Sequence, residues 1–180
     1  METKGKTKWV IDPAHSEIQF KVKHLVISTV TGKFDRFEGS AQASATDFSD
    51  LEVEFSAEVD SINTNQPDRD GHLKSADFFD AANHPKLTFK STGVRKKSDD
   101  SFVLTGDLSM RGTTKKIDLD VVYGGTITDP WGNVKAGFEI NGKVNRKEFG
   151  LHWSAVTEAG GVVVADEVKL AINVELAKQA

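Results

Sequence analysis

The sequence of 180 residues contains no cysteine. Disulfides, thiolate metal sites and thiol nucleophiles are therefore excluded, although a protein without cysteine is stable in either redox compartment. The chain also has no basic excess, because 23 Lys and Arg residues stand against 27 Asp and Glu residues, for a net charge of −4. Nucleic-acid binding depends on many phosphate contacts from basic side chains, so we expect no nucleic-acid partner.

Long apolar runs are absent as well. No run approaches the ~20 residues that a helix needs to cross a bilayer. The N-terminal METKGKTKWVID carries positive charge but lacks the apolar stretch of a secretory signal. As the sequence stands we expect a cytoplasmic location, whereas a chain whose signal peptide had been removed would be periplasmic or exported. The length fits one domain, which we place at residues 9–180 after a disordered tail at 1–8.

Apolar and polar residues alternate along most of the chain. Between Ser16 and His24, the side chains of Ile18, Phe20 and Val22 share one face, and the polar residues between them share the other. A two-residue period is the geometry of a half-buried strand. The pattern predicts eight strands, near residues 16–24, 32–43, 53–59, 87–89, 102–110, 117–123, 136–144 and 168–176.

The strands are separated by turn signals, among them Arg111-Gly112 and Gly160-Gly161, and not by helical patterns. Parallel βαβ units are therefore not expected. One apolar face per strand favours an all-β protein whose sheet is wet on one side. We favour a single eight-stranded antiparallel barrel over a sandwich, because Gly106 and Gly142 on the inward face suit the bends of a closing sheet. The interior of such a barrel is filled by side chains or holds one small ligand.

One segment, Ile62 to Pro85, does not alternate. Pro67 suits the first turn of a helix, and the residue before Pro85 is biased away from helical geometry. We predict a short helix over residues 67–79, laid across one end of the barrel as a lid that controls entry to the interior.

Seven motifs in order carry a family resemblance. They are Asp12-x-x-His15-Ser16, Phe20-x-Val22-x-His24, Val30-x-Gly32-x-Phe34, Arg69-Asp70-x-His72-Leu73-Lys74-Ser75-x-Asp77-Phe78-Phe79-Asp80, Pro85-x-Leu87-x-Phe89, Gly106-Asp107-Leu108-Ser109-Met110-Arg111-Gly112-Thr113-Thr114-Lys115 and Asn145-Arg146-x-x-Phe149-Gly150-Leu151. With them the chain, from about Trp9 to Leu176, resembles the YceI-like family of polyisoprenoid-binding proteins, which have a lipocalin-like barrel. Many members of that family look exported, and this sequence shows no signal.

The resemblance implies binding, not catalysis, with a long apolar lipid inside the barrel. The tail of an isoprenoid quinone or of a polyprenyl phosphate is the expected ligand, and no other cofactor is implied. Burial of an apolar chain contributes about 25 cal/mol per Å² removed from water, so tight binding needs no directed polar contact. We expect the tunnel wall to be formed by Ile18, Phe20, Val22, Phe34, Phe55, Val59, Leu73, Phe78, Phe79, Phe89, Leu104, Leu108, Met110, Phe138 and Ile140.

Four residues are candidates for a headgroup contact or for holding the lid. Arg69, Asp70 and His72 either anchor a phosphate or quinone oxygen, with His72 the favoured contact, or pair with barrel turns and fasten the helix. Arg146 either crosses the mouth to a carboxylate such as Asp70 or meets the headgroup, and we favour closure of the barrel end.

Other functions have less support in the sequence. No G-x-S-x-G elbow occurs, so we predict no catalytic residue, and the five histidines lack the spacing of a zinc motif, so we predict no metal site. An enzyme acting on a lipid in the same cavity and a cavity-free stress-response structural protein remain as alternatives. Trp131 and Trp153 are compatible with docked core side chains or with transient membrane contact, and a homodimer is also compatible with the sequence.

Overall fold

The computed structural model of the chain describes residues 6–25, 27–44, 48–153 and 164–179. The elements in order are β1 (Thr7–Ile11), η1 (Pro13–His15), β2 (Glu17–His24), β3 (Ser28–Phe34), β4 (Phe37–Ala43), β5 (Glu52–Glu58), η2 (Val59–Ser61), β6 (Ile62–Asn63), α1 (Pro67–Lys74), β7 (Lys86–Lys96), β8 (Ser101–Met110), β9 (Thr113–Thr128), β10 (Val134–Asn145), η3 (Arg146–Phe149) and β11 (Val164–Lys178). The predicted turn at Gly160-Gly161 and residues 1–5 of the predicted tail lie outside these ranges. Within them, no helix has the length and apolar character needed to cross a membrane.

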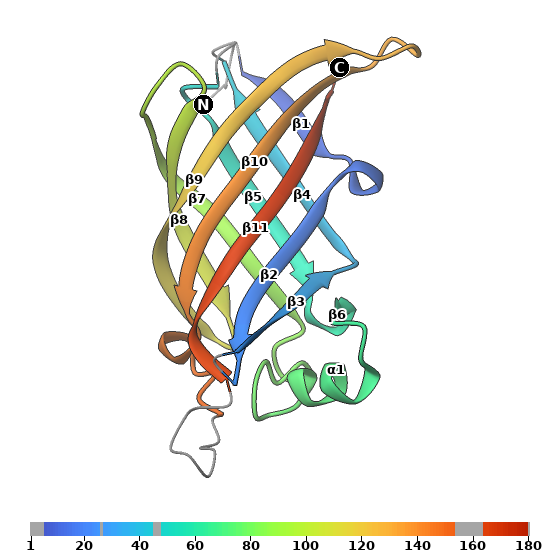
Figure 1. The fold of residues 1–180 in the computed structure, drawn as a ribbon. Coiled ribbons are helices and arrows are strands. Elements are labelled where there is room, and N and C mark those ends of the chain that lie inside the picture. The colour runs from blue at the N-terminus through green and yellow to red at the C-terminus, as the bar shows by residue number, and fades with distance from the viewer. Residues whose placement is uncertain (1–5, 26, 45–47, 154–163, 180) are drawn as a thin grey trace.

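The strands form one antiparallel sheet that closes into a barrel, because β1 pairs with β4 on one side and with β11 on the other (Figure 1). β1 and β2 both pair with β11 and act as one interrupted strand. In the same way, β3 and β4 form one interrupted strand, and β5 and β6 form another. These three composite strands and the five strands β7 to β11 make eight around the ring, which confirms the predicted barrel.

The first barrel strand begins earlier than predicted. Thr7 and Lys8 pair with Ala43 and Gln42, so β1 reaches into the segment predicted to be a tail. The strand is then interrupted by the short turn η1, where the Asp12 side chain accepts the Ala14 N–H at 3.1 Å. The sequence pattern shows only the second half of this composite strand, because the first half is too short to alternate clearly.

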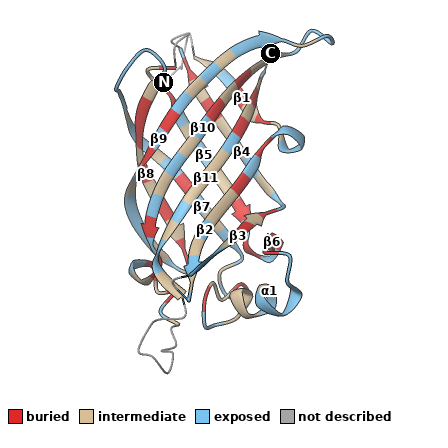
Figure 2. Ribbon diagram, viewed as in Figure 1, coloured by how far each residue is buried: buried red, intermediate tan, exposed pale blue. Residues whose placement is uncertain are grey.

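The barrel interior is the core of the protein (Figure 2). Inward side chains such as Phe102, Leu104 and Leu108 on β8 are buried, whereas the outer face of the sheet is mostly exposed. The alternation seen in the sequence therefore corresponds to the inner and outer faces of a closed sheet.

Helix α1 lies beside the barrel mouth opposite the two termini (Figure 1). We call this end of the barrel the helix end and the other the termini end. The helix spans Pro67–Lys74 and not the predicted 67–79. It begins with Pro67 in its first turn, as predicted, and the Gln66 side chain accepts the Arg69 N–H at 2.9 Å. It ends early because the Ser75 hydroxyl and N–H both donate to the His72 carbonyl, which diverts the backbone into turns.

Candidate functional site

A cavity of about 200 Å³ lies inside the barrel. Residues of every barrel strand line it, from Ile11 and Leu176 toward the termini end to Phe79 and Met110 toward the helix end. The wall is aliphatic and aromatic except for Gln19, Ser40 and Arg146. A space of this size exceeds the ~150 Å³ that holds a benzene-sized molecule and is smaller than the ~300–1,000 Å³ of most ligand pockets. A long chain must therefore displace some of the wall side chains as it enters.

All but one of the predicted tunnel residues line this cavity. They are Ile18, Phe20, Val22, Phe34, Phe55, Leu73, Phe78, Phe79, Phe89, Leu104, Leu108, Met110, Phe138 and Ile140. The exception is Val59, which is buried but does not line the cavity. The strand ends at Glu58, and the Val59 N–H donates to the Pro85 carbonyl as η2 begins, so the two-residue period no longer holds at Val59.

The predicted wall is incomplete on the side of β11. Val168, Leu170, Ile172, Val174 and Leu176 all line the cavity. Their alternation is visible in the sequence, and extending the tunnel prediction to every inward strand position would have included them.

At the helix end the cavity is covered by Leu73 of α1 and by Phe78 and Phe79 from the turns that follow. Phe79 packs edge-on against Phe34 with ring centroids 6.1 Å apart, and Phe34 packs against Phe20 at 5.7 Å. The lid therefore consists of a helix residue and the two aromatic residues after the helix, held by aromatic contacts to the barrel wall.

At the termini end, Phe48 from the loop between β4 and β5 packs behind the cavity wall, against the cavity-lining ring of Phe138. Its side chain is 2% exposed, and its ring lies 5.0 Å from Phe138, 5.1 Å from Tyr123 and 5.3 Å from Trp9. The backbone of Phe48 has a φ of 62°, a region that bulky residues rarely adopt. The sequence does not predict this aromatic cluster of Trp9, Phe48, Tyr123 and Phe138, because a single phenylalanine in a polar loop carries no periodic signal.

Arg69 and Asp70 fasten α1 to the end of β6. The Arg69 guanidinium donates from Nε to Thr64 Oγ1 at 2.8 Å and from Nη2 to the Thr64 carbonyl at 2.7 Å. Asp70 Oδ1 accepts the Thr64 N–H at 2.9 Å and the Thr64 hydroxyl at 2.5 Å. Thr64 is buried, and neither Arg69 nor Asp70 lines the cavity. These contacts favour the latch interpretation of the two residues over a headgroup contact.

Replacing Arg69 with alanine should lower the free energy of unfolding by about 1–3 kcal/mol, because the buried Thr64 carbonyl loses its donor. Arg69→Lys should recover little of this loss, since an ammonium cannot reproduce the guanidinium fork. Urea denaturation measures both effects, with Lys74→Ala in the same helix as a control that should cost less. A headgroup contact would instead produce unchanged stability and weaker binding only of lipids that carry a headgroup.

His72 lies outside the cavity. Its Nε2 is 2.8 Å from Asp77 Oδ2, and its ring packs edge-on against Phe78 at 5.1 Å and against Trp153 at 4.9 Å. Trp153 is thus a docked, partly buried side chain, whereas Trp131 is 83% exposed at the tip of the β9–β10 hairpin. His72 supports Phe78 from the outer side of the lid.

Arg146 is 3% exposed and ties together three segments at the helix end. Its Nε donates to the Ala165 carbonyl at 2.9 Å, and its Nη1 donates to the carbonyls of Leu151 and Trp153, both at 2.7 Å. Its guanidinium carbon also lies 5.8 Å from the centre of the Phe78 ring. Burial lowers the pKa of Arg146, and the Asp166 carboxylate opposes this shift. The partners of Arg146 at this barrel end are backbone carbonyls and not the predicted carboxylate of Asp70.

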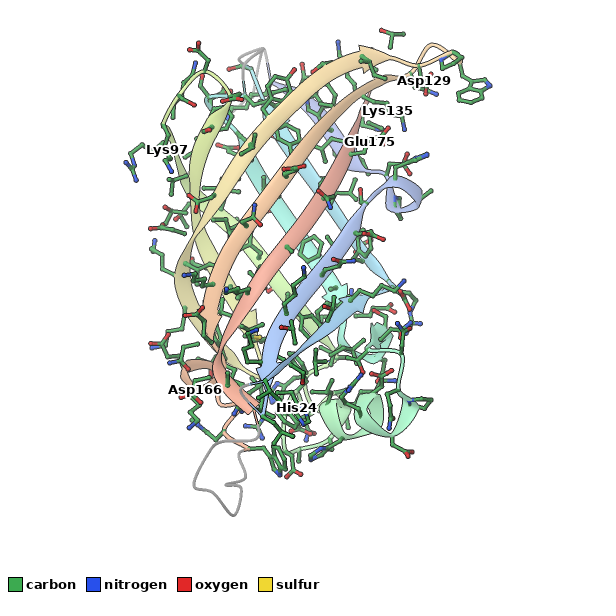
Figure 3. The ribbon with its side chains drawn as sticks, viewed as in Figure 1. His24, Lys97, Asp129, Lys135, Asp166 and Glu175 are labelled. Atoms are coloured by element: carbon green, nitrogen blue, oxygen red, sulfur yellow. The ribbon has the colours of Figure 1, made fainter. Side chains whose placement is uncertain are left out.

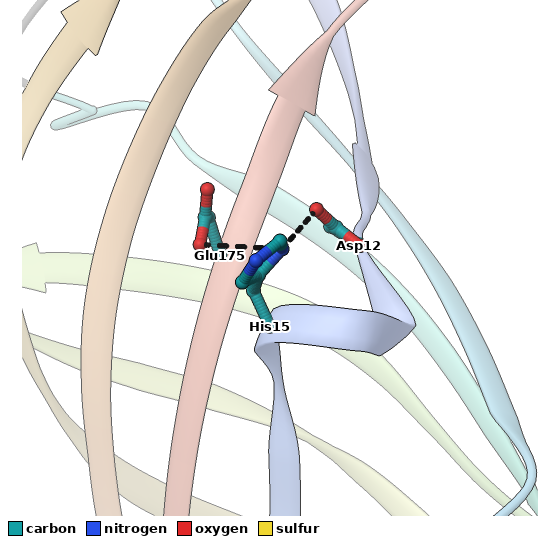
Figure 4. Close-up of side chains that lie close together, drawn as sticks. All are labelled: Asp12, His15 and Glu175. Carbon is teal, nitrogen blue, oxygen red and sulfur yellow. Dashed lines mark hydrogen bonds and ion pairs between the residues drawn. The ribbon is translucent and has the colours of Figure 1, made fainter. Parts of the chain in front are cut away.

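Asp12, His15 and Glu175 bring three ligand atoms within 4.8 Å of one another on the outer wall (Figure 4). His15 Nδ1 is 2.8 Å from Asp12 Oδ2 and 4.0 Å from Glu175 Oε2. Lys135 Nζ is 2.9 Å from the same Asp12 oxygen, and both Lys135 and Glu175 lie toward the termini end (Figure 3). The positive charge of the Lys135 ammonium would repel a metal cation bound here. The group is therefore better described as an ion-pair cluster, which stabilises the turn between β1 and β2.

This cluster predicts a pH dependence of stability. Hydrogen bonds from His15 and then Lys135 lower the pKa of Asp12 from 3.8 to about 2. Because the folded-state pKa is depressed, the stabilisation is present above pH 4 and is lost as the pH falls from about 4 to about 2. We expect Asp12→Asn to cost about 1–2 kcal/mol at neutral pH, after screening by solvent, and nothing near pH 2. Urea denaturation at several pH values measures this, with the exposed Glu17→Gln as control; parallel pH curves for Asp12→Asn and wild type would contradict it.

Comparison with known proteins adds to this geometry. The YceI-like domain family matches residues 9–176. A UPF0312 protein of Staphylococcus aureus strain USA300 is 36% identical over 170 residues, which cover 94% of this chain and 96% of that protein. The solved Campylobacter jejuni YCEI protein is 31% identical with a TM-score of 0.75, over 88% of this chain and 90% of that one. A polyisoprenoid binding domain from Saccharophagus degradans shares the fold, with a TM-score of 0.66 at 15% identity, over 97% of this chain and 99% of that one.

Proposed function

Because the chain belongs to the YceI-like domain family, we propose that it binds a long apolar lipid in the barrel cavity and carries, stores or sequesters it. The expected ligand is an isoprenoid, such as the tail of a quinone or of a polyprenyl phosphate. The observation that carries the proposal is the cavity itself, whose wall is aliphatic and aromatic apart from Gln19, Ser40 and Arg146. The polyisoprenoid binding domain of S. degradans, which shares this fold, supports the isoprenoid class.

An enzyme acting on a lipid in the same cavity is the competing proposal. Such an enzyme needs an acid, a base or a nucleophile near the ligand. Of the cavity-lining residues among the described part of the chain, Arg146 alone is titratable, and it donates to backbone carbonyls, so the one lining hydroxyl, that of Ser40, has no lining base to activate it. The binding role is therefore the better supported of the two. A carrier exchanges its cargo with a bilayer, so transient membrane contact belongs to the same proposal.

Native mass spectrometry of the purified protein, followed by organic extraction, tests the proposal. We expect a mass above that of the chain, which disappears on extraction and corresponds to a lipid of isoprenoid composition. Purification of the protein with an empty cavity that takes up no added polyprenol or quinone would contradict it.

A pair of variants locates the ligand. Phe55→Glu places a carboxylate in the cavity wall, where burial of charge opposes an apolar ligand, so bound lipid should be lost. Thr88→Glu places the same group on the exposed outer face of the neighbouring strand and should leave lipid content unchanged. Circular dichroism confirms that both variants fold, and equal lipid content in both would show that the ligand lies elsewhere.

A further inference from the structure

The barrel wall splits between β9 and β10. These strands pair only as far as Asp120 and Asn141, although β9 begins at Thr113 and β10 continues to Asn145. On the far sides the pairing continues to the strand ends, with β8 for β9 and with β11 for β10. Residues 113–119 and 142–145 therefore each have one edge that is not paired across this split.

A groove of about 620 Å³ lies on the outer surface at the split. Three of its lining side chains, Ile117, Val144 and Leu170, also line the barrel cavity. A Cβ on Gly142 would lie 2.6 Å from Leu119 Cδ2, so this glycine leaves room for the leucine side chain, which lines the barrel cavity at this level. The groove and the cavity are thus adjacent spaces with a thin aliphatic partition between them.

Lysines gather beside the groove in an unfavourable arrangement. Lys143 of β10 lies directly opposite Lys169 of β11, which lies directly opposite Lys21 of β2. Like charges at opposite positions on neighbouring strands destabilise a sheet. The only ion pair of this row among the described residues joins Lys143 to Glu167, at 4.0 Å. Lys143 and Lys169 line the groove directly, so an anion bound there would relieve their repulsion.

The groove also contains carboxylates, and two of the three are engaged elsewhere. Asp118 accepts a hydrogen bond from the Thr105 hydroxyl at 2.6 Å, and Asp120 lies 3.6 Å from Lys97. Both partners lie on the side of β9 away from β10. Glu148 lies at the rim of the groove, beyond the end of β10. Lys143 and Lys169 thus lie on the β10–β11 side of the groove, whereas Asp118 and Asp120 lie on its β9 side with partners of their own.

We propose that this groove holds the anionic end, a phosphate or a carboxylate, of a lipid whose apolar chain reaches the cavity between Ile117, Val144 and Leu170. The inference rests on the proposed function and names the part of the ligand that the cavity does not accommodate. Arg69 and Arg146 at the helix end are less suited to this role, since both already donate to protein oxygens there.

Fluorescence competition with three probes tests this inference: geranylgeranyl phosphate, geranylgeraniol and inorganic phosphate. Wild type should bind the phosphate lipid about tenfold or more tightly than the alcohol, the scale of charge-assisted hydrogen bonds. The double variant Lys143→Gln/Lys169→Gln should lose that preference and keep its affinity for the alcohol. Lys86→Gln removes an exposed lysine from β7, away from the groove, and should behave as wild type.

Equal binding of the two lipids by wild type would overturn the inference, as would equal losses of both in the double variant. Inorganic phosphate that binds as tightly as the phosphate lipid would overturn it too, because the anion site would then be independent of the cavity. Binding of neither lipid by wild type would overturn the proposed function, and the inference with it.

Discussion

Replacing Arg146 with methionine should lower the free energy of unfolding by about 3–5 kcal/mol, because several backbone carbonyls lose a charged donor at about 1–3 kcal/mol each. The guanidinium is the shared donor for carbonyls before and after residues 154–163, at Leu151, Trp153, Val164 and Ala165. Methionine is apolar and donates no hydrogen bond, so these carbonyl oxygens lose their partner.

Lys147→Met is the matched control. Lys147 is the next residue and lies 3.2 Å from Asp166, but its side chain is 40% exposed. A surface pair of this kind contributes about 0–1 kcal/mol. Urea denaturation of both variants and wild type makes the comparison. If the two variants lost the same stability, Arg146 would not be the residue that closes the helix end.

The strand pattern accounts for most of the fold, because a closed sheet with one buried face imposes a period of two on every strand. That is why Phe20, Leu104 and Phe138 could be placed in the wall from the sequence. The pattern fails where the backbone leaves the sheet. Val59 follows the strand period in sequence, but the turn η2 removes it from the wall.

The ends of the barrel were harder to predict, because side-chain to backbone hydrogen bonds determine them. Ser75 ends α1 at Lys74, whereas the predicted helix continues to Phe79. The carbonyls that Arg146 binds come from segments with no periodic pattern. The split between β9 and β10 was also hidden, since both strands alternate through it and only their register shows that they separate.

Removing the ring of Phe48 should lengthen the cavity at the termini end. The ring packs among Trp9, Tyr123 and Phe138, and Phe138 lines the cavity. Phe48→Gly is the preferred change, because glycine adopts the φ of 62° at this position without steric cost. Loss of a buried phenyl ring costs about 3–5 kcal/mol of stability, which relief of the backbone partly offsets, so the variant should still fold.

In the variant, the cavity should accommodate a tail longer by about one isoprene unit. Each additional CH₂ that is buried should strengthen binding by about 0.8 kcal/mol. Competition binding with isoprenols of increasing length measures this effect. The affinity of wild type should stop rising at a certain chain length. Phe48→Gly should bind the next longer isoprenol about 2–4 kcal/mol more tightly than wild type binds it. Phe37→Ala is the control, because Phe37 also packs on a cavity-lining ring, that of Phe55 at 6.2 Å, but it begins β4 and so lies at the other end of that strand from the loop of Phe48. Its length limit should match wild type. An unchanged limit in Phe48→Gly would mean that the chain ends before it reaches the aromatic cluster, and that the termini end has no part in choosing the ligand.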